Sequence, residues 1–557
     1  MTAHHLPPAR IQLLQELAHT YGTPLYVYDM PQIARNFTAF KQNFSGRKSL
    51  ICYALKANSN LSVLRLLAEL GSGADCVSIG EVRRALLAGI PAYKTIFSGV
   101  GKRDDEIKQA LELGILFINV ESFEELKRVE AIAKELAQEL ESKEQKLESS
   151  KDSLQKARIS IRVNPNIDPK THPYISTGLH ENKFGVDMDS AKQMYLYAHK
   201  SAFLEPIGIH FHIGSQLTEL EPLTQAARKI ADLARSLLAL GINLRFFDIG
   251  GGLGIRYEDE KPIDLYDYAQ GILSTLSGCD WTIVCEPGRR IVGDSGLLLT
   301  RVISQKHTES KRFVIVDAGM NDLMRPALYG AFHQPILLGY GRDLVLGRQC
   351  GSVGVFAEGT NAKFANLPQK RQSSHSPTAT PRILEEENEK STENQKVDSS
   401  TATTLNEQAQ DSRISKETSP NGERCPLFCD EKLGLSSDWQ GSYLSGNDRR
   451  QSRRIADLSR KAESSSEQPM PKADIVGPVC ESSDTFCKNI ALPPLHNGTL
   501  LGFENAGAYG YSMASTYNAR MRPAEVGIYA NGARLIKSRE SFEASVADEL
   551  ALLDSSK

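Results

Sequence analysis

The sequence predicts an α/β fold, a (β/α)8 barrel followed by a β-rich second domain. Between residues 50 and 289, eight short apolar runs alternate with longer stretches of helical periodicity. Eight strand–helix repeats over roughly 240 residues match the size of a (β/α)8 barrel. After residue 289 the apolar runs follow one another without long helices between them. The length of 557 residues also exceeds the roughly 250–300 at which a single core stops growing.

The eight apolar runs have the composition of strands that are buried on both faces. Most are rich in Val, Ile and Phe and carry few charges. They span residues 50–55, 74–77, 94–97, 116–120, 159–163, 207–211, 244–249 and 282–285. Helical patterns lie between them, for example at 60–71, 79–90 and 104–114. A doubly wound open sheet is the alternative, and the barrel is preferred because eight is its strand number.

The segments outside these repeats are assigned by the same patterns. The N-terminus predicts an amphipathic helix, with Ile11, Leu14, Leu17 and Ala18 at helical spacing. Residues 25–29 predict a strand that joins the second domain, and residues 132–155 predict a charged, solvated helix. The apolar runs after residue 289 predict the strands of the second domain, at 296–304, 312–319, 473–479, 500–507 and 525–536. Residues 541–553 predict a C-terminal helix.

Residues 360–470 have a different composition from the rest. Ser, Thr, Glu, Gln, Lys and Asn dominate, and Phe428 is the only aromatic residue between 365 and 437. Such a segment cannot bury enough apolar surface to offset its ordering entropy, so we expect a mostly disordered insertion. Cys425 and Cys429 lack a following ligand pair, and no zinc site is expected there. The expected domains are 1–40 (helix and strand that join the β-domain), 41–295 (barrel), 296–359 with 471–557 (β-domain), and the insertion.

Composition narrows the function classes. Lys plus Arg number 65 and Asp plus Glu 68, so the net charge of -3 gives no reason to expect nucleic acid or an anionic membrane as partner. No apolar run reaches the ~18 residues of a membrane span, and the N-terminus lacks signal-peptide character. Nine Cys without an export signal indicate reduced thiols. We therefore expect a soluble cytoplasmic enzyme.

In a (β/α)8 barrel the reactive residues lie at the carboxyl ends of the strands. Lys56 follows the first strand, where desolvation would lower its pKa and suit it to Schiff-base chemistry. A lysine that extends to the barrel rim is the alternative. The seventh strand ends in DIGGGLG (248–254) and the eighth in EPGRR (286–290). Loops after these two strands form the usual phosphate site of such barrels, and consecutive glycines present N–H groups to an anion.

His212 follows the sixth strand and has three possible roles. It could stack on a flat cofactor, bind a metal, or lie in the core. His210 and His212 share one strand face, but no third ligand is evident, so no metal is expected. A lysine, a phosphate loop and the carboxylate of Glu286 at one barrel mouth fit pyridoxal 5'-phosphate (PLP), which needs an amine, N–H groups for its phosphate, and an acid beside its pyridine nitrogen.

Seven motifs in order carry a family resemblance. They are YALKAN (53–58), HIGSQ (212–216), DIGGGLG (248–254), EPGR (286–289), DAGMNDLMRPALY (317–329), GPVCESSD (477–484) and GAYGYSMASTYN (507–518). The chain resembles the diaminopimelate decarboxylases, which have the alanine-racemase-like fold of PLP enzymes. The resemblance implies decarboxylation of meso-2,6-diaminopimelate at its D-centre to L-lysine and CO2 through a PLP aldimine and quinonoid. This is the last step of lysine biosynthesis, in a homodimer with shared active sites.

The resemblance also implies roles for particular residues. Lys56 would form the aldimine, and Cys480 would donate the final proton at the site of the neighbouring subunit. The cofactor-binding residues would be Lys56, Asp75, His212, Ser215, Gly250, Gly251, Gly252, Glu286, Gly288, Arg289 and Tyr509. The substrate-binding residues would be Arg289, Arg325, Tyr329, Glu481 and Tyr509. Residues 172–178 and 181–186 resemble the lid over the site.

The sequence alone leaves alternatives for the roles of these residues and for the class of enzyme. Taken singly, Arg289 and Arg325 could form surface ion pairs, Cys480 could be a buried inert thiol, and Tyr509 could belong to the core. Decarboxylases of ornithine, arginine or carboxynorspermidine share the lysine, the glycines and EPGR, although those acting on ornithine and arginine resemble this chain less around GPVCES. A catalytically inactive PLP-binding protein would be expected to lack Lys56 or Cys480, and a racemase lacks the RPALY and CES motifs.

Overall fold

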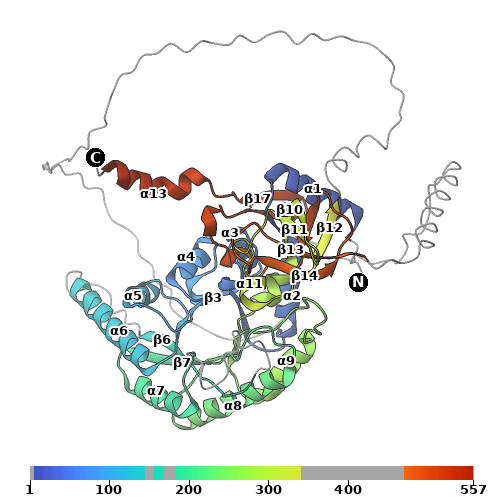
Figure 1. Cartoon of the computed structure of the whole chain (residues 1–557). Coiled ribbons are helices and arrows are strands. Elements are labelled where there is room, and N and C mark those ends of the chain that lie inside the picture. Colours follow the sequence, from blue (N-terminus) through green and yellow to red (C-terminus); the bar gives the residue numbers. More distant parts are fainter. Residues whose placement is uncertain (1–5, 145–155, 169–182, 340–469, 556–557) are drawn as a thin grey trace, which may run out of the picture. The chain divides into compact units, whose positions relative to one another are not determined.

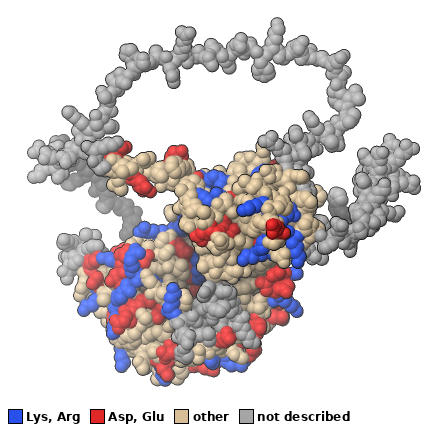
Figure 2. Space-filling view, in the orientation of Figure 1, with Lys and Arg blue, Asp and Glu red and all other residues tan. Residues whose placement is uncertain are grey.

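The computed structural model describes residues 6–144, 156–168, 183–339 and 470–555 (Figure 1). Most of the expected insertion, with Cys425 and Cys429, lies outside these residues, as do positions 172–178 of the expected lid. Within the described part of the chain, no helix is both long enough and apolar enough to cross a membrane. Basic and acidic side chains both occur across the face shown in Figure 2, in line with the balanced composition.

A closed barrel of eight parallel strands confirms the predicted fold. Each predicted apolar run overlaps one strand, although β2, β3, β6 and β7 begin one to three residues earlier than predicted. The strands are β2 (Ser49–Ala54), β3 (Gly73–Cys76), β4 (Thr95–Phe97), β5 (Phe117–Val120), β6 (Ala157–Arg162), β7 (Leu204–His210), β8 (Phe246–Asp248) and β9 (Thr282–Cys285). Strand β2 pairs with β9, with Leu50 opposite Val284, which closes the barrel. The doubly wound open sheet is therefore wrong.

A helix follows each barrel strand. These helices are α3 (Leu61–Glu69), α4 (Ile79–Leu87), α5 (Asp104–Glu112), α6 (Phe123–Glu144), α7 (Met188–Lys200), α8 (Leu220–Ala239), α9 (Leu265–Thr275) and α10 (Arg289–Val292). In Figure 1, α6 to α9 lie outside the strands. Helix α8 shows why, because its apolar residues recur at helical spacing and its buried side includes Leu223, Ile230 and Leu237. The order strand, loop, helix places the carboxyl ends of all eight strands at one rim.

The second domain is a nine-stranded sheet. Its strands are β1 (Leu25–Asp29), β10 (Gly296–His307), β11 (Arg312–Val316), β12 (Pro335–Gly339), β13 (Lys472–Val476), β14 (Thr485–Ala491), β15 (Leu500–Phe503), β16 (Ala524–Tyr529) and β17 (Gly532–Lys537). Strand β1 pairs with β10 and with β16, which confirms that the N-terminal strand joins this domain. Helix α1 (Pro8–Tyr21) and the C-terminal helix α13 (Phe542–Ser555) are also as expected.

Three details of this sheet differ from the expectation. The run 525–536 is a hairpin of two strands, β16 and β17, joined by Ala530 and Asn531 and followed by Gly532, whose φ is +123°. Strand β12 was not predicted because it is short and begins with a proline. Strand β14 was not predicted because its pattern is broken by Lys488 and by Asn489, which has a positive φ of 56°.

Candidate active site

Lys56 lies directly after β2, in a short 3-10 turn (Leu55–Ala57), and opens onto a cavity of about 570 Å³. Residues from both domains line this cavity: Lys56, Phe184, His212, Ser215, Gln216, Tyr257, Glu258, Glu260, Arg289, Arg325, Tyr329, Gly330, Ala331, Phe332, Tyr509 and Met513. Six of the residues implied by the resemblance are thereby joined to the lysine in one hollow. Lys56 therefore does not simply extend to the barrel rim, because its side chain lines the cavity.

Lys56 forms an ion pair with a buried carboxylate. Its Nζ lies 3.0 Å from Oδ2 of Asp75, which comes from β3 and has a fully buried side chain. Burial would lower the pKa of Lys56, but attraction to Asp75, Tyr509 and Glu286 outweighs it and raises the pKa above its ordinary value. The expectation of a lowered pKa is therefore wrong in this state of the protein. The amine is held as an ammonium ion by Asp75.

The glycine loop after β8 packs tightly against the ends of the neighbouring strands. A Cβ on Gly250 would lie 2.5 Å from the carbonyl oxygen of Phe211, and one on Gly251 would collide with that of Glu286. Gly252 has φ +107° and equally little room, against Gly214. The Glu286 N–H donates to the Gly250 carbonyl over 2.7 Å. The three glycines therefore let the loop after β8 pack closely against the ends of β7 and β9 at the barrel mouth.

His212 has a neutral ring. The N–H of Gly251 donates to its Nδ1 over 3.2 Å, so the ring proton sits on Nε2. Burial, together with Arg162 and Lys56, lowers the pKa of His212 well below its ordinary value. A neutral imidazole that lines the cavity is suited to stacking against a flat ring.

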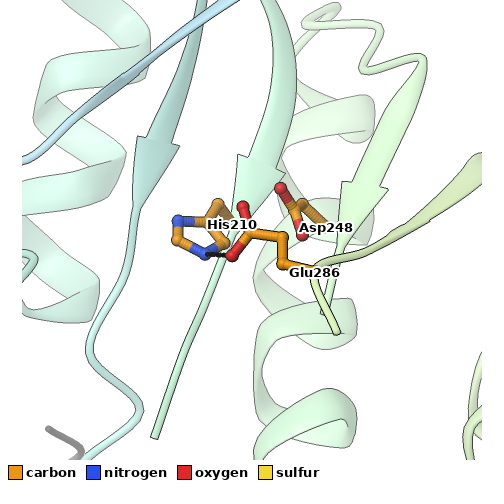
Figure 3. A group of neighbouring side chains, drawn as sticks. All are labelled: His210, Asp248 and Glu286. Carbon is orange, nitrogen blue, oxygen red and sulfur yellow. Dashed lines mark ion pairs between the residues drawn. The ribbon is translucent and has the colours of Figure 1, made fainter. Parts of the chain in front are cut away.

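Three buried side chains gather at the ends of β7, β8 and β9, namely His210, Asp248 and Glu286 (Figure 3). Nε2 of His210 lies 3.4 Å from Oε2 of Glu286. Oε1 of Glu286, Oδ2 of Asp248 and Nδ1 of His210 have no hydrogen-bond partner within the described residues. The ligand atoms of the three side chains lie within 4.8 Å of one another, as in a set that could hold a cation. His210 therefore has two carboxylates beside it that the sequence did not reveal, whereas His212 is not part of this set. That no metal is bound stays a prediction.

The two carboxylates of this cluster differ in charge. Burial and the proximity of Glu286 raise the pKa of Asp248 well above its ordinary value. Burial also opposes ionisation of Glu286, but attraction to His210, Lys56 and His212 outweighs it and lowers the pKa of Glu286. Asp248 therefore holds a proton while Glu286 is ionised. A buried, ionised carboxylate fits a protonated heteroaromatic nitrogen, as the pyridine of PLP requires.

Arg289 starts α10 and is 6% exposed. One guanidinium nitrogen donates to the hydroxyl of Tyr257 over 2.7 Å, and the other donates to Oγ of Ser215 over 3.0 Å. The ring of Tyr509 lies 4.9 Å from its guanidinium carbon. Gly288, just before it, packs its Cα face against Ala54 and Ala57 beside the lysine. A surface ion pair is therefore the wrong interpretation of Arg289.

Arg325 begins the short helix α11 (Arg325–Tyr329), whose other end brings Tyr329 to the cavity. The Arg325 side chain is also buried, and its guanidinium carbon lies 4.6 Å from the ring centre of Tyr257. Within the part of the chain that the structure describes, neither Arg289 nor Arg325 forms an ion pair with a carboxylate. Two buried cations in one cavity without a counter-charge indicate an anionic ligand.

Tyr509 belongs to the sheet domain, yet it lines the cavity beside Lys56. Its N–H donates to the carbonyl of Ala57 over 2.8 Å, so the backbone next to the lysine holds it. Its φ is +58°, a conformation that costs energy for a side chain of this size. A conformation of this kind is typical of functional sites, and a plain core position does not describe this residue.

Cys480 and Glu481 lie elsewhere, in the exposed loop between β13 and β14, and neither lines the cavity. The backbone N–H of Cys480 donates to Oδ1 of Asn518 over 3.2 Å. The hydroxyl of Tyr517 donates to Oε1 of Glu481 over 2.5 Å and lowers the pKa of Glu481. Cys480 is thus no buried inert thiol, and its service to a neighbouring subunit stays a prediction.

The sequence analysis missed Tyr257 as a site residue. It contacts both arginines and follows the glycine loop in GIRYEDE (254–260). No spacing rule marks such a residue, because its role depends on where α11 of the other domain meets the barrel. Asp248 could have been noticed, since it ends a buried strand immediately before the glycines.

Comparison with known proteins first defines the class. Residues 30–293 match the family model for the pyridoxal-dependent decarboxylase pyridoxal binding domain, and residues 447–507 match that for the pyridoxal-dependent decarboxylase C-terminal sheet domain. With the lysine, the glycine loop and the buried carboxylate in place, the chain is a PLP-dependent decarboxylase of alanine-racemase-like fold.

The most similar relatives narrow this class. Diaminopimelate decarboxylase of Helicobacter pylori strain J99 is 45% identical over 529 residues, covering 95% of this chain and 96% of that protein. The Campylobacter jejuni diaminopimelate decarboxylase is 41% identical, covering 96% and 98%. A crystal structure of the H. pylori enzyme complexed with L-lysine superposes with a TM-score of 0.69 at 43% identity, covering 97% and 99%. The chain belongs to the diaminopimelate decarboxylase family.

Proposed function

We propose that this chain decarboxylates meso-2,6-diaminopimelate at its D-centre to give L-lysine and CO2, the last step of lysine biosynthesis. The observation that carries the proposal is the pair of buried guanidinium groups, Arg289 and Arg325, in the cavity that Lys56 opens onto. Diaminopimelate has two carboxylates, and one of them stays with the product. A site that keeps such a substrate needs a cation for the retained carboxylate.

The described residues fit PLP as the cofactor, which supplies an electron sink for the carbon that loses CO2. Lys56 would hold its aldehyde carbon, and Glu286 would hold its ring nitrogen. The neutral ring of His212 would stack on its face. The phosphate would lie at the glycine loop, with the set Ser215, Gly250, Gly251, Gly252 and Gly288 around it.

Several residues of the chain would act on the substrate or on protons. Asp75 lies 3.0 Å from Nζ of Lys56 and would stabilise positive charge on that nitrogen, both when Lys56 is bonded to PLP and when a substrate amine has released it. Arg325 and Tyr329 would bind the retained carboxylate, and Tyr509 would contact both cofactor and substrate from the sheet domain.

We propose further that the working unit is a cytoplasmic homodimer. Cys480 and Glu481 are exposed and outside the cavity of their own chain. In a two-fold dimer they would complete the site of the neighbouring subunit, with Cys480 delivering the final proton and Glu481 binding the distal ammonium group.

The direct test is product analysis. The purified protein, loaded with PLP, is incubated with meso-diaminopimelate, and lysine and CO2 are measured together. Equal amounts of the two products are expected, and Lys56→Ala under the same conditions should give neither. A wild-type protein with bound PLP that forms no lysine would contradict the proposal.

A further inference from the structure

We infer that His333 is a positioning residue that orients Arg325 for recognition of a substrate carboxylate without neutralising the positive charge of Arg325. The inference rests on the proposed function and adds to it a residue that does not line the cavity. His333 has no exposed surface and lies between α11 and β12, eight residues after Arg325.

Both ring nitrogens of His333 are engaged in the described structure. Nε2 lies 2.8 Å from a terminal nitrogen of Arg325, and Nδ1 lies 2.9 Å from the carbonyl oxygen of Glu504. A guanidinium can only donate and a carbonyl can only accept. Nε2 must therefore accept from Arg325, and the ring proton must sit on Nδ1 and point to Glu504.

This arrangement needs a neutral ring. Burial, together with the nearby Arg325, lowers the pKa of His333 to about 3. The ring is consequently uncharged near neutral pH. Its orientation is fixed from the far side by the backbone that follows β15, so the acceptor presented to Arg325 cannot rotate away without losing the bond to Glu504.

Tyr257 holds the same guanidinium from its flat side. The Arg325 guanidinium carbon lies 4.6 Å from the Tyr257 ring centre, and the ring of His333 meets that of Tyr257 edge-on, with centres 5.5 Å apart and an interplanar angle of 78°. The Tyr257 hydroxyl is itself held by Arg289 over 2.7 Å. Arg325 is thus fixed by two neutral partners, the ring nitrogen of His333 and the side chain of Tyr257.

Both partners of Arg325 are uncharged: a neutral imidazole and a tyrosine side chain. A carboxylate in place of His333 would also fix Arg325, but it would neutralise the guanidinium and compete with the carboxylate of the substrate. A neutral nitrogen and a ring face orient the group and leave its charge for the ligand. Preorganisation of this kind improves binding because less side-chain freedom is lost when the ligand arrives.

The test uses a matched pair of substitutions. In His333→Gln the amide oxygen can take the place of Nε2 and accept from Arg325. In His333→Asn the shorter amide can reach Glu504 but not Arg325. We expect His333→Asn to raise KM for meso-diaminopimelate about 10-fold or more, since small displacements of a positioning group are costly. His333→Gln should recover most of this loss, and kcat and the visible absorption of bound PLP should change little in both.

Two ligands separate this role from a general structural one. L-lysine, the proposed product, keeps the carboxylate that Arg325 would bind, and cadaverine is the same chain without it. His333→Asn should weaken inhibition by lysine about 10-fold or more and leave inhibition by cadaverine unchanged. Equal weakening of both, or no change in either, would overturn the inference.

A double-mutant cycle completes the test. If His333 acts through Arg325, His333→Asn should have almost no further effect in an Arg325→Ala background. An undiminished effect there would contradict the inference. These outcomes are distinct from a failure of the proposed function, because that failure would appear in the wild-type protein as an absence of lysine formation.

Discussion

Replacing Glu286 by Gln changes one charge at the centre of the site and little else. The side chain is 5% exposed, and its Oε2 lies 3.4 Å from Nε2 of His210. Burial opposes its ionisation, but attraction to His210, Lys56 and His212 lowers its pKa, so the wild-type group is a carboxylate. Gln keeps the size and removes the charge that would pair with the protonated ring nitrogen of PLP.

The expected magnitude follows from the kind of bond that is lost. A buried hydrogen bond to a charged group contributes about 1.5–3 kcal/mol, which corresponds to a cofactor affinity roughly 10- to 150-fold weaker. Turnover at saturating PLP should fall as well, because an unprotonated pyridine is a poorer electron sink. The assay is titration of the apoprotein with PLP, followed by its visible absorption, and then kcat at saturation.

Asp248→Asn is the matched control, since Asp248 belongs to the same buried cluster but carries a proton. Replacement of a neutral acid by a neutral amide should change PLP affinity less than about threefold, well below the 1.5 kcal/mol expected of a lost charged bond. The reverse outcome, a large effect of Asp248→Asn and a small effect of Glu286→Gln, would show that the charge sits on Asp248 and would refute this assignment.

Three further outcomes are expected. Arg325→Ala should lower kcat/KM for meso-diaminopimelate by a factor equivalent to about 2–5 kcal/mol of transition-state stabilisation, because it removes the cation that would pair with the substrate carboxylate. The absorption of bound PLP should not change, and its loss would show that Arg325 binds the cofactor. Mixed dimers of Lys56→Ala and Cys480→Ala chains should regain activity that neither has alone, and failure despite proven subunit exchange would place each site within one chain. Deletion of residues 363–465 with a short Gly/Ser joint should leave kcat and KM within about twofold, because every described site residue lies outside that range; loss of PLP binding in a soluble protein would contradict this.

The barrel could be predicted from the sequence because strands that are buried on both faces are mostly apolar. Each of the eight predicted runs overlaps one barrel strand for that reason. The sheet domain was less readable. Its strands are partly exposed, β12 begins with a proline, and β14 contains a residue with positive φ, so neither shows a clean alternation.

The candidate site was predictable where its residues follow a strand, and not where two domains meet. Lys56, the glycines and Glu286 could be placed because each ends a barrel strand. The charge of Lys56 could not be predicted, because it depends on the ion pair with Asp75, at 3.0 Å, and not on burial alone. Tyr257 was missed because its role arises only where Arg325 of α11 meets the barrel, and His333 was missed because its bonds to Arg325 and Glu504 depend on how the sheet domain folds.

Substrate preference tests the central claim most directly. The PLP-loaded protein is assayed in parallel with meso-diaminopimelate, ornithine and arginine, and kcat/KM is measured for each. Arg289 and Arg325 are buried, and neither has a carboxylate partner among the described residues. Ornithine and arginine have no second carboxylate to pair with them, so kcat/KM for these substrates should be lower by a factor of about 10⁴. L-lysine should be the only amino-acid product formed at an appreciable rate. Comparable kcat/KM values for ornithine or arginine would contradict the account and return the chain to the other decarboxylases of this fold.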